Sequence, residues 1–201
     1  GDLVIKKNTL INSNHIKALK ALGIENIKVK KKINITFFST GNEISEKNYI
    51  SGWKIRNSNH HYLKSLNNNF LFNFKNLGIL RDKDENKFYK KLLKILKSKT
   101  DIIITSGAVS AGKFDFIPKV IKKLQLSHSF KNILIRPGKP IFFAKFKSKS
   151  KVIFGLPGNP ISTAACFRFF IFPYIQNILG LNTERSIKAR LKNNFIKKKK
   201  F

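Results

Sequence analysis

Several residue types are scarce in this sequence of 201 residues, and each scarcity is informative. There is no methionine, so the chain is expected not to begin at a translation start and to be a piece of a longer protein. The single cysteine, Cys166, cannot form an internal disulfide and fits a reducing cytoplasm. Because Cys166 lies in an apolar helical stretch, it is predicted to be a buried structural thiol and not a nucleophile.

Long apolar runs are also missing, since none reaches the ~18 residues that a membrane helix needs. The nearest, residues 167–175, contains Arg168 and Pro173. No signal peptide is visible either. Hydrophobic residues make up 42% of the chain and include 19 Phe, which predicts a packed globular protein with no membrane partner.

Acidic residues are few, 10 against 41 Lys and Arg, which gives a net charge of +31. Such a charge favours binding to nucleic acid or another anionic surface, because bound cations release counterions. The alternative is compositional drift, since Lys, Asn, Ile and Phe are abundant together, as in an AT-rich genome. No known nucleic-acid-binding motif accompanies the lysines. They are expected to be scattered and not to line one stripe, as at Lys87, Lys90, Lys91, Lys94 and Lys97. Drift is therefore favoured, and no specific nucleic-acid partner is predicted.

Short apolar segments alternate with helix-like segments along the chain. Strands are expected at 33–38, 70–74, 101–104, 133–135, 141–146 and 152–154, the last two forming a hairpin. Helices are expected at 60–66, at 84–97, from Pro118 and at 162–178, where Pro173 should kink or end the regular turn. The alternation predicts an α/β fold with helices on both faces of the sheet.

Four polar, glycine-containing loops follow strands in this pattern: 40–43, 105–112, 136–140 and 155–160. Ligands in such sheets bind beyond the carboxyl ends of the strands, so the loops are expected to converge on one site. In the 105–112 loop, glycine would let backbone N–H groups approach a phosphate, with Asp115 as the fixed charge beside it. An ordinary turn rich in small residues is an equally weighted alternative.

The motifs TGNE (40–43), SGAVSAGKFDF (106–116), RPGKP (136–140) and GLPGNP (155–160) closely resemble those of the molybdopterin molybdenumtransferases. That family includes the C-terminal domain of gephyrin, and the resemblance covers most of residues 1–190. It implies a three-layer α/β/α sandwich with a mostly parallel sheet and one hairpin. Residues 1–31 would be the end of a preceding domain, 32–180 the molybdopterin-binding domain, and 181–201 the truncated start of a β-rich domain.

The resemblance also implies an activity in molybdenum cofactor biosynthesis. Enzymes of this family insert molybdate into adenylylated molybdopterin and release AMP with the help of a divalent cation, here taken as Mg²⁺. The implied protein is a cytoplasmic homodimer that works with other enzymes of molybdenum cofactor biosynthesis. The 201 residues alone are expected to bind nucleotide weakly and not to turn over.

Carried over by the resemblance, Glu43 and Asp115 are the catalytic and metal-binding carboxylates. The other matching positions would contact substrate: Thr105, Ser106, Gly107, Ser110 and Gly112 as a phosphate cradle, Asn57 and Asn59 near ribose or pyrophosphate, Lys139 on an anion, and Pro157, Asn159 and Pro160 as a pocket wall. Glu43 and Asp115 could instead only cap the segments that follow them. His60 and His61 are expected to be surface residues and not metal ligands.

Three positions depart from the family pattern. Asn57 replaces a carboxylate, Asn42 stands where Asp is common, and Ala108 replaces a usual glycine, so a weakened or specialised family member is an alternative. Two other functions also stay open. One is a molybdopterin adenylyltransferase, which would act on ATP with magnesium and without molybdate. The other is a non-catalytic scaffold module in which the acids are vestigial.

Overall fold

The computed structural model describes residues 2–69, 71–107, 116–147, 150–184, 187–190 and 192–193. The chain forms two compact units, of which residues 32–171 make the larger. Residues 1–31 and 172–200 make the smaller one, which contains α1 (Ser13–Ala21) and α6 (Phe172–Leu179). The predicted division into domains at 31 and 180 stays a prediction.

The larger unit is built on a six-stranded sheet of order β4-β1-β5-β8-β7-β6. Four neighbouring strands are parallel: β4 (Phe72–Leu80), β1 (Ile33–Thr40), β5 (Ile102–Ser106) and β8 (Val152–Leu156). Then β7 (Phe142–Phe146) pairs antiparallel with β8, which makes the predicted hairpin. Every residue of β5 and β8 is buried, as continuous apolar strands between two helical layers require. The α/β fold with a mostly parallel sheet is therefore confirmed.

One predicted strand is wrong. Residues 133–135 lie in an irregular connection, and the edge strand is β6 (Leu126–Lys131), which pairs antiparallel with β7. Five of the six residues of β6 are exposed, so this strand carries no apolar run by which it could be recognised. Among the apolar residues that follow β6, Ile135 packs beside Gly138 in the next turn and is not part of a strand.

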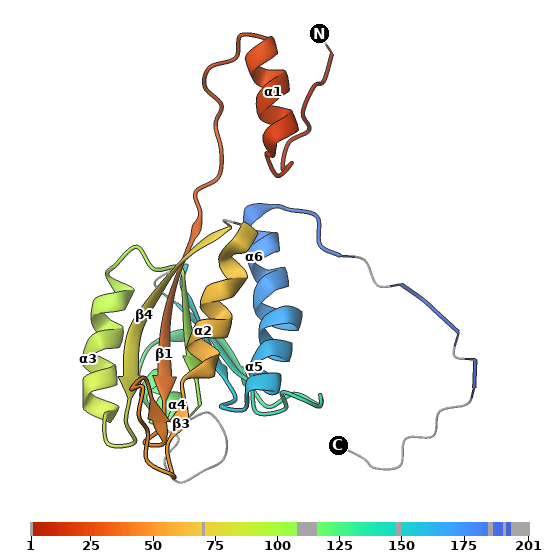
Figure 1. Cartoon of the computed structure of the whole chain (residues 1–201). Helices are drawn as coiled ribbons and strands as arrows, with labels where there is room; N and C mark the ends of the chain where they lie inside the picture. Colours follow the sequence, from red (N-terminus) through yellow and green to blue (C-terminus); the bar gives the residue numbers. More distant parts are fainter. Residues whose placement is uncertain are drawn as a thin grey trace. The chain divides into compact units, whose positions relative to one another are not determined.

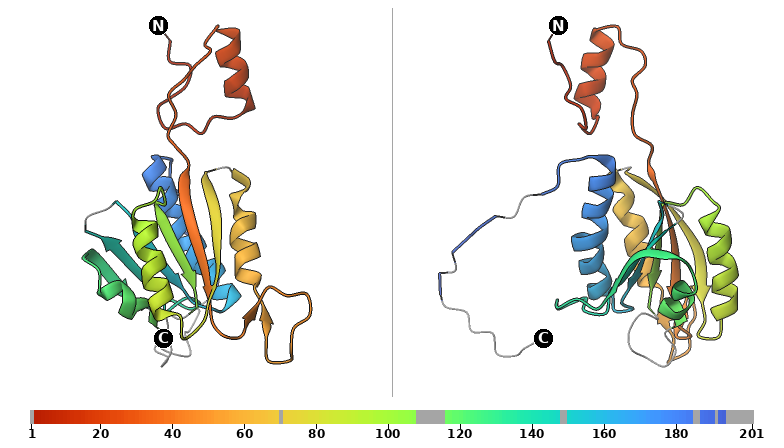
Figure 2. Two further views of the ribbon diagram at one scale, coloured as in Figure 1. Left: turned by 90° about the vertical axis from the view of Figure 1, so that its left-hand side faces the viewer. Right: turned by 180° about the vertical axis from the view of Figure 1, so that it is seen from behind.

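Helices cover both faces of the sheet (Figures 1 and 2). On one face, α3 (Glu85–Leu96) and α4 (Phe116–Lys122) pack together over a buried cluster that includes Phe38, Phe88 and Ile103. On the other face lie α2 (Ser58–Ser65), followed by the 3₁₀ turn η1 (Leu66–Asn69), and α5 (Pro160–Cys166). A second, two-stranded parallel sheet, β2 (Ile44–Ser45) with β3 (Ile55–Arg56), lies between β1 and α2 in the chain.

The long helix predicted at 162–178 is interrupted. α5 leads into a π-helical turn, η2 (Phe167–Ile171), and α6 begins directly after it. The irregular turn stands just before Pro173, which has no N–H to continue the regular hydrogen bonding. In the described ranges no helix combines the length and the apolar character that spanning a membrane requires.

The lysines of α3 are not scattered as expected. Lys87, Lys90, Lys91 and Lys94 follow the helical spacing i, i+3, i+4, i+7 and, with Asn86, line a surface hollow of about 370 Å³. Two of them have local partners, because Lys87 pairs with Asp84 at 3.3 Å and Lys91 donates to the Leu77 carbonyl. The prediction that these residues do not share one stripe is therefore wrong for this helix.

Candidate functional site

Three of the four polar loops meet beyond the carboxyl ends of β1, β5 and β8. Thr40 Oγ1 donates to the carbonyl of Ser106 at 2.9 Å, and the N–H of Gly107 donates to the carbonyl of Leu156 at 2.8 Å. These strands are parallel neighbours, so their polar ends share one edge of the sheet. Loops that are far apart in the sequence are thus joined by direct hydrogen bonds.

Asn59 connects two of these loops from the first turns of α2. Its Nδ2 atom donates to Ser106 Oγ at 2.6 Å and to the Gly158 carbonyl at 2.8 Å. Among the residues that the structure describes, its buried Oδ1 atom has no hydrogen-bond partner, and the same holds for Oγ1 of Thr105 at the end of β5. Buried polar atoms are nearly always paired, so each of these oxygens points to a partner outside the described residues.

Gly107 makes the close approach of these loops possible. Its φ is +94°, and a Cβ atom there would lie 2.6 Å from both the carbonyl oxygen and Oγ1 of Thr40. No side chain fits that space, and the backbone conformation also disfavours any residue other than glycine. The 105–107 segment therefore keeps its backbone next to the end of β1.

Glu43 lies in the loop after β1, where its carboxylate covers the Cα of Gly41 so closely that a Cβ would overlap it. Arg81 stabilises this loop by donating from Nη1 to the carbonyls of Gly41 and Ile44, each at 2.8 Å. Lys54 Nζ donates to the carbonyl of Asn42. Within the described part of the chain the Glu43 carboxylate has no hydrogen bond or ion pair of its own, so it remains available to a ligand.

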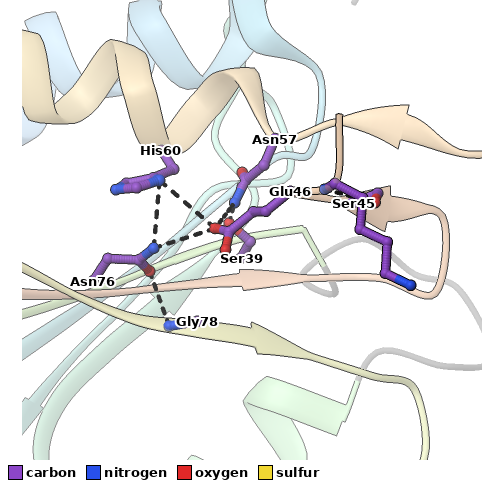
Figure 3. A network of polar contacts seen from close by, with 8 residues as sticks. Ser39, Ser45, Glu46, Asn57, His60, Asn76 and Gly78 are labelled. Carbon is purple, nitrogen blue, oxygen red and sulfur yellow. Dashed lines mark hydrogen bonds and ion pairs between the residues drawn. The ribbon is translucent and has the colours of Figure 1, made fainter. Parts of the chain in front are cut away.

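Asn57 is buried just before α2 and lies in a polar network (Figure 3). Its Oδ1 accepts from Ser39 Oγ at 2.8 Å, and its Nδ2 donates to Glu46 Oε1 at 2.9 Å. Asn57 and Asn59 therefore have different neighbours although they are two residues apart. Asn59 faces the loops after β5 and β8, whereas Asn57 faces the end of β1 and the residue that follows β2.

The loop after β8 ends in a well-capped helix. Asn159 is the N-cap of α5, its Oδ1 accepts from the N–H of Ser162 at 3.1 Å, and Pro160 is the first helical residue. The carbonyl of Pro157 accepts from Thr163 Oγ1 at 2.6 Å. These three predicted pocket residues thus all stabilise the start of the helix, which fixes the loop beside Gly107.

Several predicted site residues are not placed by this geometry. Ser110, Gly112 and Asp115, with Ala108, lie outside the described residues, so the pairing of Glu43 with Asp115 stays a prediction. Lys139 is exposed, and no described hydrogen bond or ion pair joins its side chain to the other loops. Its neighbour Gly138 instead packs against Cys166 Sγ, whose thiol is buried as predicted.

The described residues contain no group of three or more His, Cys, Asp or Glu that could hold a metal ion. Mg²⁺ is commonly held by one or two carboxylates together with substrate phosphates and water. The Glu43 carboxylate, which has no partner among the described residues, fits such a shared site.

Sequence reasoning missed three residues of this region. Arg81 and Glu46 are single charges without a motif, and nothing in the sequence distinguishes them. His60 was expected on the surface but is half-buried, stacked on Phe37 with the ring centroids 6.2 Å apart. Burial lowers the pKa of His60 from its usual 6.5, and nearby His61 and Lys64 add to this shift while Glu46 opposes it.

Comparisons with known proteins agree with the α/β fold. Residues 36–177 match the family model described as a probable molybdopterin binding domain. The whole chain is 31% identical to a molybdopterin molybdenumtransferase from Staphylococcus epidermidis and 32% identical to one from Staphylococcus aureus, and it covers 48% of each. A molybdopterin biosynthesis protein from Pyrococcus horikosii superposes with a TM-score of 0.75 at 29% identity, over 90% of this chain and 44% of that one. The chain spans about half the length of the curated relatives it matches.

Proposed function

Since the chain belongs to the family of probable molybdopterin-binding domains, we propose that its polar strand ends bind adenylylated molybdopterin. The bound substrate would receive molybdate and release AMP, as a molybdopterin molybdenumtransferase requires. The chain would supply this site within a longer, cytoplasmic, homodimeric protein that works with other enzymes of molybdenum cofactor biosynthesis. This function accounts for both the motif resemblance and the position of the site at the strand ends.

The observation that supports this proposal most directly is the unpaired, buried oxygen of Asn59 beside the end of β5. Among the described residues Asn59 Oδ1 has no partner, and neither has Thr105 Oγ1, while hydrogen bonds join Thr40 to Ser106 and Asn59 to Gly158. The Gly107 backbone lies beside them without a side chain in the way. A ligand with hydroxyl groups and phosphate oxygens, such as a nucleotide, matches these acceptors and donors.

The chemistry needs mainly positioning and neutralisation of charge, because cleavage of a phosphoanhydride leaves little covalent work to the protein. Residues 105–107 and Asn59 would orient the phosphate and ribose. Glu43, with Asp115, would hold Mg²⁺, which would supply charge neutralisation at the phosphate when bound. Ser110, Gly112 and Lys139 would contribute further anion contacts, and Asn57 would act from the side of β1.

The test is molybdate-dependent AMP release from adenylylated molybdopterin by the longer protein that contains this chain. Replacing Glu43 by Gln keeps the shape and breaks no described hydrogen bond, so the unfolding midpoint should not change. The rate of AMP release should fall by about 100-fold, as expected when one preorganised electrostatic contact is lost. Glu25→Gln is the matched control, because its carboxylate lies on an exposed surface and pairs there with Lys20.

Other results would exclude the proposal. Transfer of AMP from ATP to molybdopterin with magnesium and without molybdate would identify an adenylyltransferase instead. Full function of both the Glu43→Gln and the Asp115→Ala proteins in cells would identify a scaffold whose acids are vestigial.

A further inference from the structure

Glu46 is the acceptor at the centre of a network built from four parts of the chain (Figure 3). Its Oε1 atom accepts from Asn57 Nδ2 at 2.9 Å and from Asn76 Nδ2 of β4 at 3.3 Å. Nδ1 of His60, on α2, lies 3.7 Å from the same oxygen. Two amide groups and an imidazole from separate elements therefore surround one carboxylate oxygen, although the Glu46 side chain is 44% exposed.

The network fixes which way each amide points. The N–H of Gly78 donates to Asn76 Oδ1 at 2.9 Å, so the Asn76 nitrogen must face Glu46 and His60. An ionised carboxylate can only accept, so the Asn57 nitrogen must face Glu46 and its oxygen must face Ser39. The orientation of Asn57 thus follows from the charge on Glu46.

Asn57 is fixed at the start of α2 through its backbone and its network partners. It is the N-cap residue of that helix without a side-chain capping bond, and its backbone N–H donates to the Ser45 carbonyl at 3.1 Å. Two residues later Asn59 reaches Ser106 and Gly158. A shift at Asn57 would therefore move the side chain that connects the loops after β5 and β8.

We propose that Glu46 is a positioning residue of the site: its carboxylate holds the Asn57 amide and, through it, the segment that carries Asn59. Glu46 also carries the negative charge that a carboxylate at position 57 would otherwise bring. The chain thus carries this charge on Glu46, which contacts residue 57 in space, and keeps an amide at position 57 itself. The ligand of the site is taken from the proposed function, on which this inference rests. The coupling of Glu46 to Asn57 does not depend on that function.

Relocating the charge tests the proposal. In Asn57→Asp, two carboxylates would face each other across the present 2.9 Å contact, and one of them would have to take up a proton. Adding Glu46→Gln restores one charge and one amide with their positions exchanged. The rate of molybdate-dependent AMP release by the longer protein should fall about tenfold in Asn57→Asp and recover in the double variant. The Asn57→Asp protein alone should regain rate as the pH is lowered, which loss of fold stability would not produce.

Urea unfolding of the 201-residue chain and its affinity for AMP give two further readouts. The two substitutions should be non-additive in unfolding by about tenfold in the equilibrium constant, and the double variant should bind AMP more tightly than Asn57→Asp alone. Asn48→Asp adds the same charge to the same loop without touching the network, and should leave all measurements unchanged.

Additive effects on unfolding would overturn the proposal, because the two side chains would then act independently. Coupling in unfolding with unchanged AMP affinity and unchanged AMP release in Asn57→Asp would overturn the positioning role and leave a structural contact. If the unmodified protein releases no AMP with molybdate, the proposed function fails, while unfolding and AMP affinity still decide the role of Glu46.

Discussion

At the scale of single residues, the site depends on backbone positions as much as on side chains. Gly107 and Gly41 both have positive φ and both stand where a Cβ would overlap a neighbour, Thr40 in one case and the Glu43 carboxylate in the other. For Gly41 the neighbour is a flexible side chain, which can move. For Gly107 it includes the backbone of β1, which cannot move without disturbing the sheet.

Gly107→Ala should therefore destabilise the chain and weaken AMP binding together. We expect the strained backbone to lower the free energy of unfolding by about 1–3 kcal/mol, measured by urea denaturation. Gly52→Ala is the matched control, because a Cβ there meets no atom within 4 Å. Equal stability of the two variants would show that the end of β1 adapts to the added methyl group and that Gly107 is not needed for close approach.

Asn59 shows what the sequence could not reveal at this scale. The resemblance places both Asn57 and Asn59 near ribose or pyrophosphate, but it does not indicate which of the two amides contacts the neighbouring loops. That distinction depends on Glu46 and Asn76, which come from a loop and a strand outside the four motifs. Long-range side-chain contacts of this kind have no local sequence signal.

At the scale of elements, α2 combines structural and electrostatic roles. His60 stacks against both Phe37 and Phe74, whose ring centroids lie 6.2 and 6.1 Å from its own and 5.7 Å from each other, and its Nδ1 lies 3.3 Å from Asn76 Nδ2. An amide nitrogen donates, so this contact suits a neutral imidazole that accepts at Nδ1. The lowered pKa of His60, caused chiefly by burial, agrees with that state.

The stability of the chain should therefore decrease as the pH falls below about 6.5, the ordinary pKa of histidine. Below that pH the unfolded chain takes up a proton at His60 before the folded chain does, so the stability gained from a neutral His60 is lost as the pH falls through the folded pKa. Urea midpoints from pH 7.5 to 5 should show a shallower dependence in His60→Phe than in the unmodified chain. His128→Gln, on the exposed edge strand β6, should keep the unmodified dependence; the same slope in all three would contradict the prediction.

Elements were predictable where burial forces an apolar pattern. The runs at 33–38, 101–104 and 152–154 became β1, β5 and β8 because both of their faces are covered by helices. The edge strand β6 was missed for the opposite reason, since an exposed edge tolerates a polar sequence such as LSHSFK. The convergence of three polar loops followed from the strand order, whereas the position of the 136–140 loop depends on a connection that the pattern misassigned.

At the scale of the whole molecule, the excess of 31 positive charges is the dominant electrostatic feature. The acidic side chains mostly interact with groups close to them. Glu85, for example, accepts hydrogen bonds from Lys119 and Lys123, and the bond from Lys123 is the main reason that the pKa of Glu85 is lowered. The lysine stripe on α3 raises a question that composition alone left open. Either it is a dedicated anionic-ligand site, or it is one part of a charge that acts over the entire surface.

We expect the charge to act as a whole, so that duplex DNA binds weakly, without sequence preference and with a Kd of about 10⁻⁵ M at physiological salt. The measurement is a salt titration of DNA binding for two charge-reversed variants of equal net charge. Lys90→Glu with Lys94→Glu removes charge from the α3 hollow, while Lys64→Glu with Lys145→Glu removes it from α2 and β7. Both pairs should weaken binding to the same extent and reduce the salt slope equally, because the field depends on net charge and not on one helix. A much larger loss for the α3 pair, or retention of one DNA sequence at high salt, would instead identify the hollow as a specific nucleic-acid site and contradict drift as the origin of the charge.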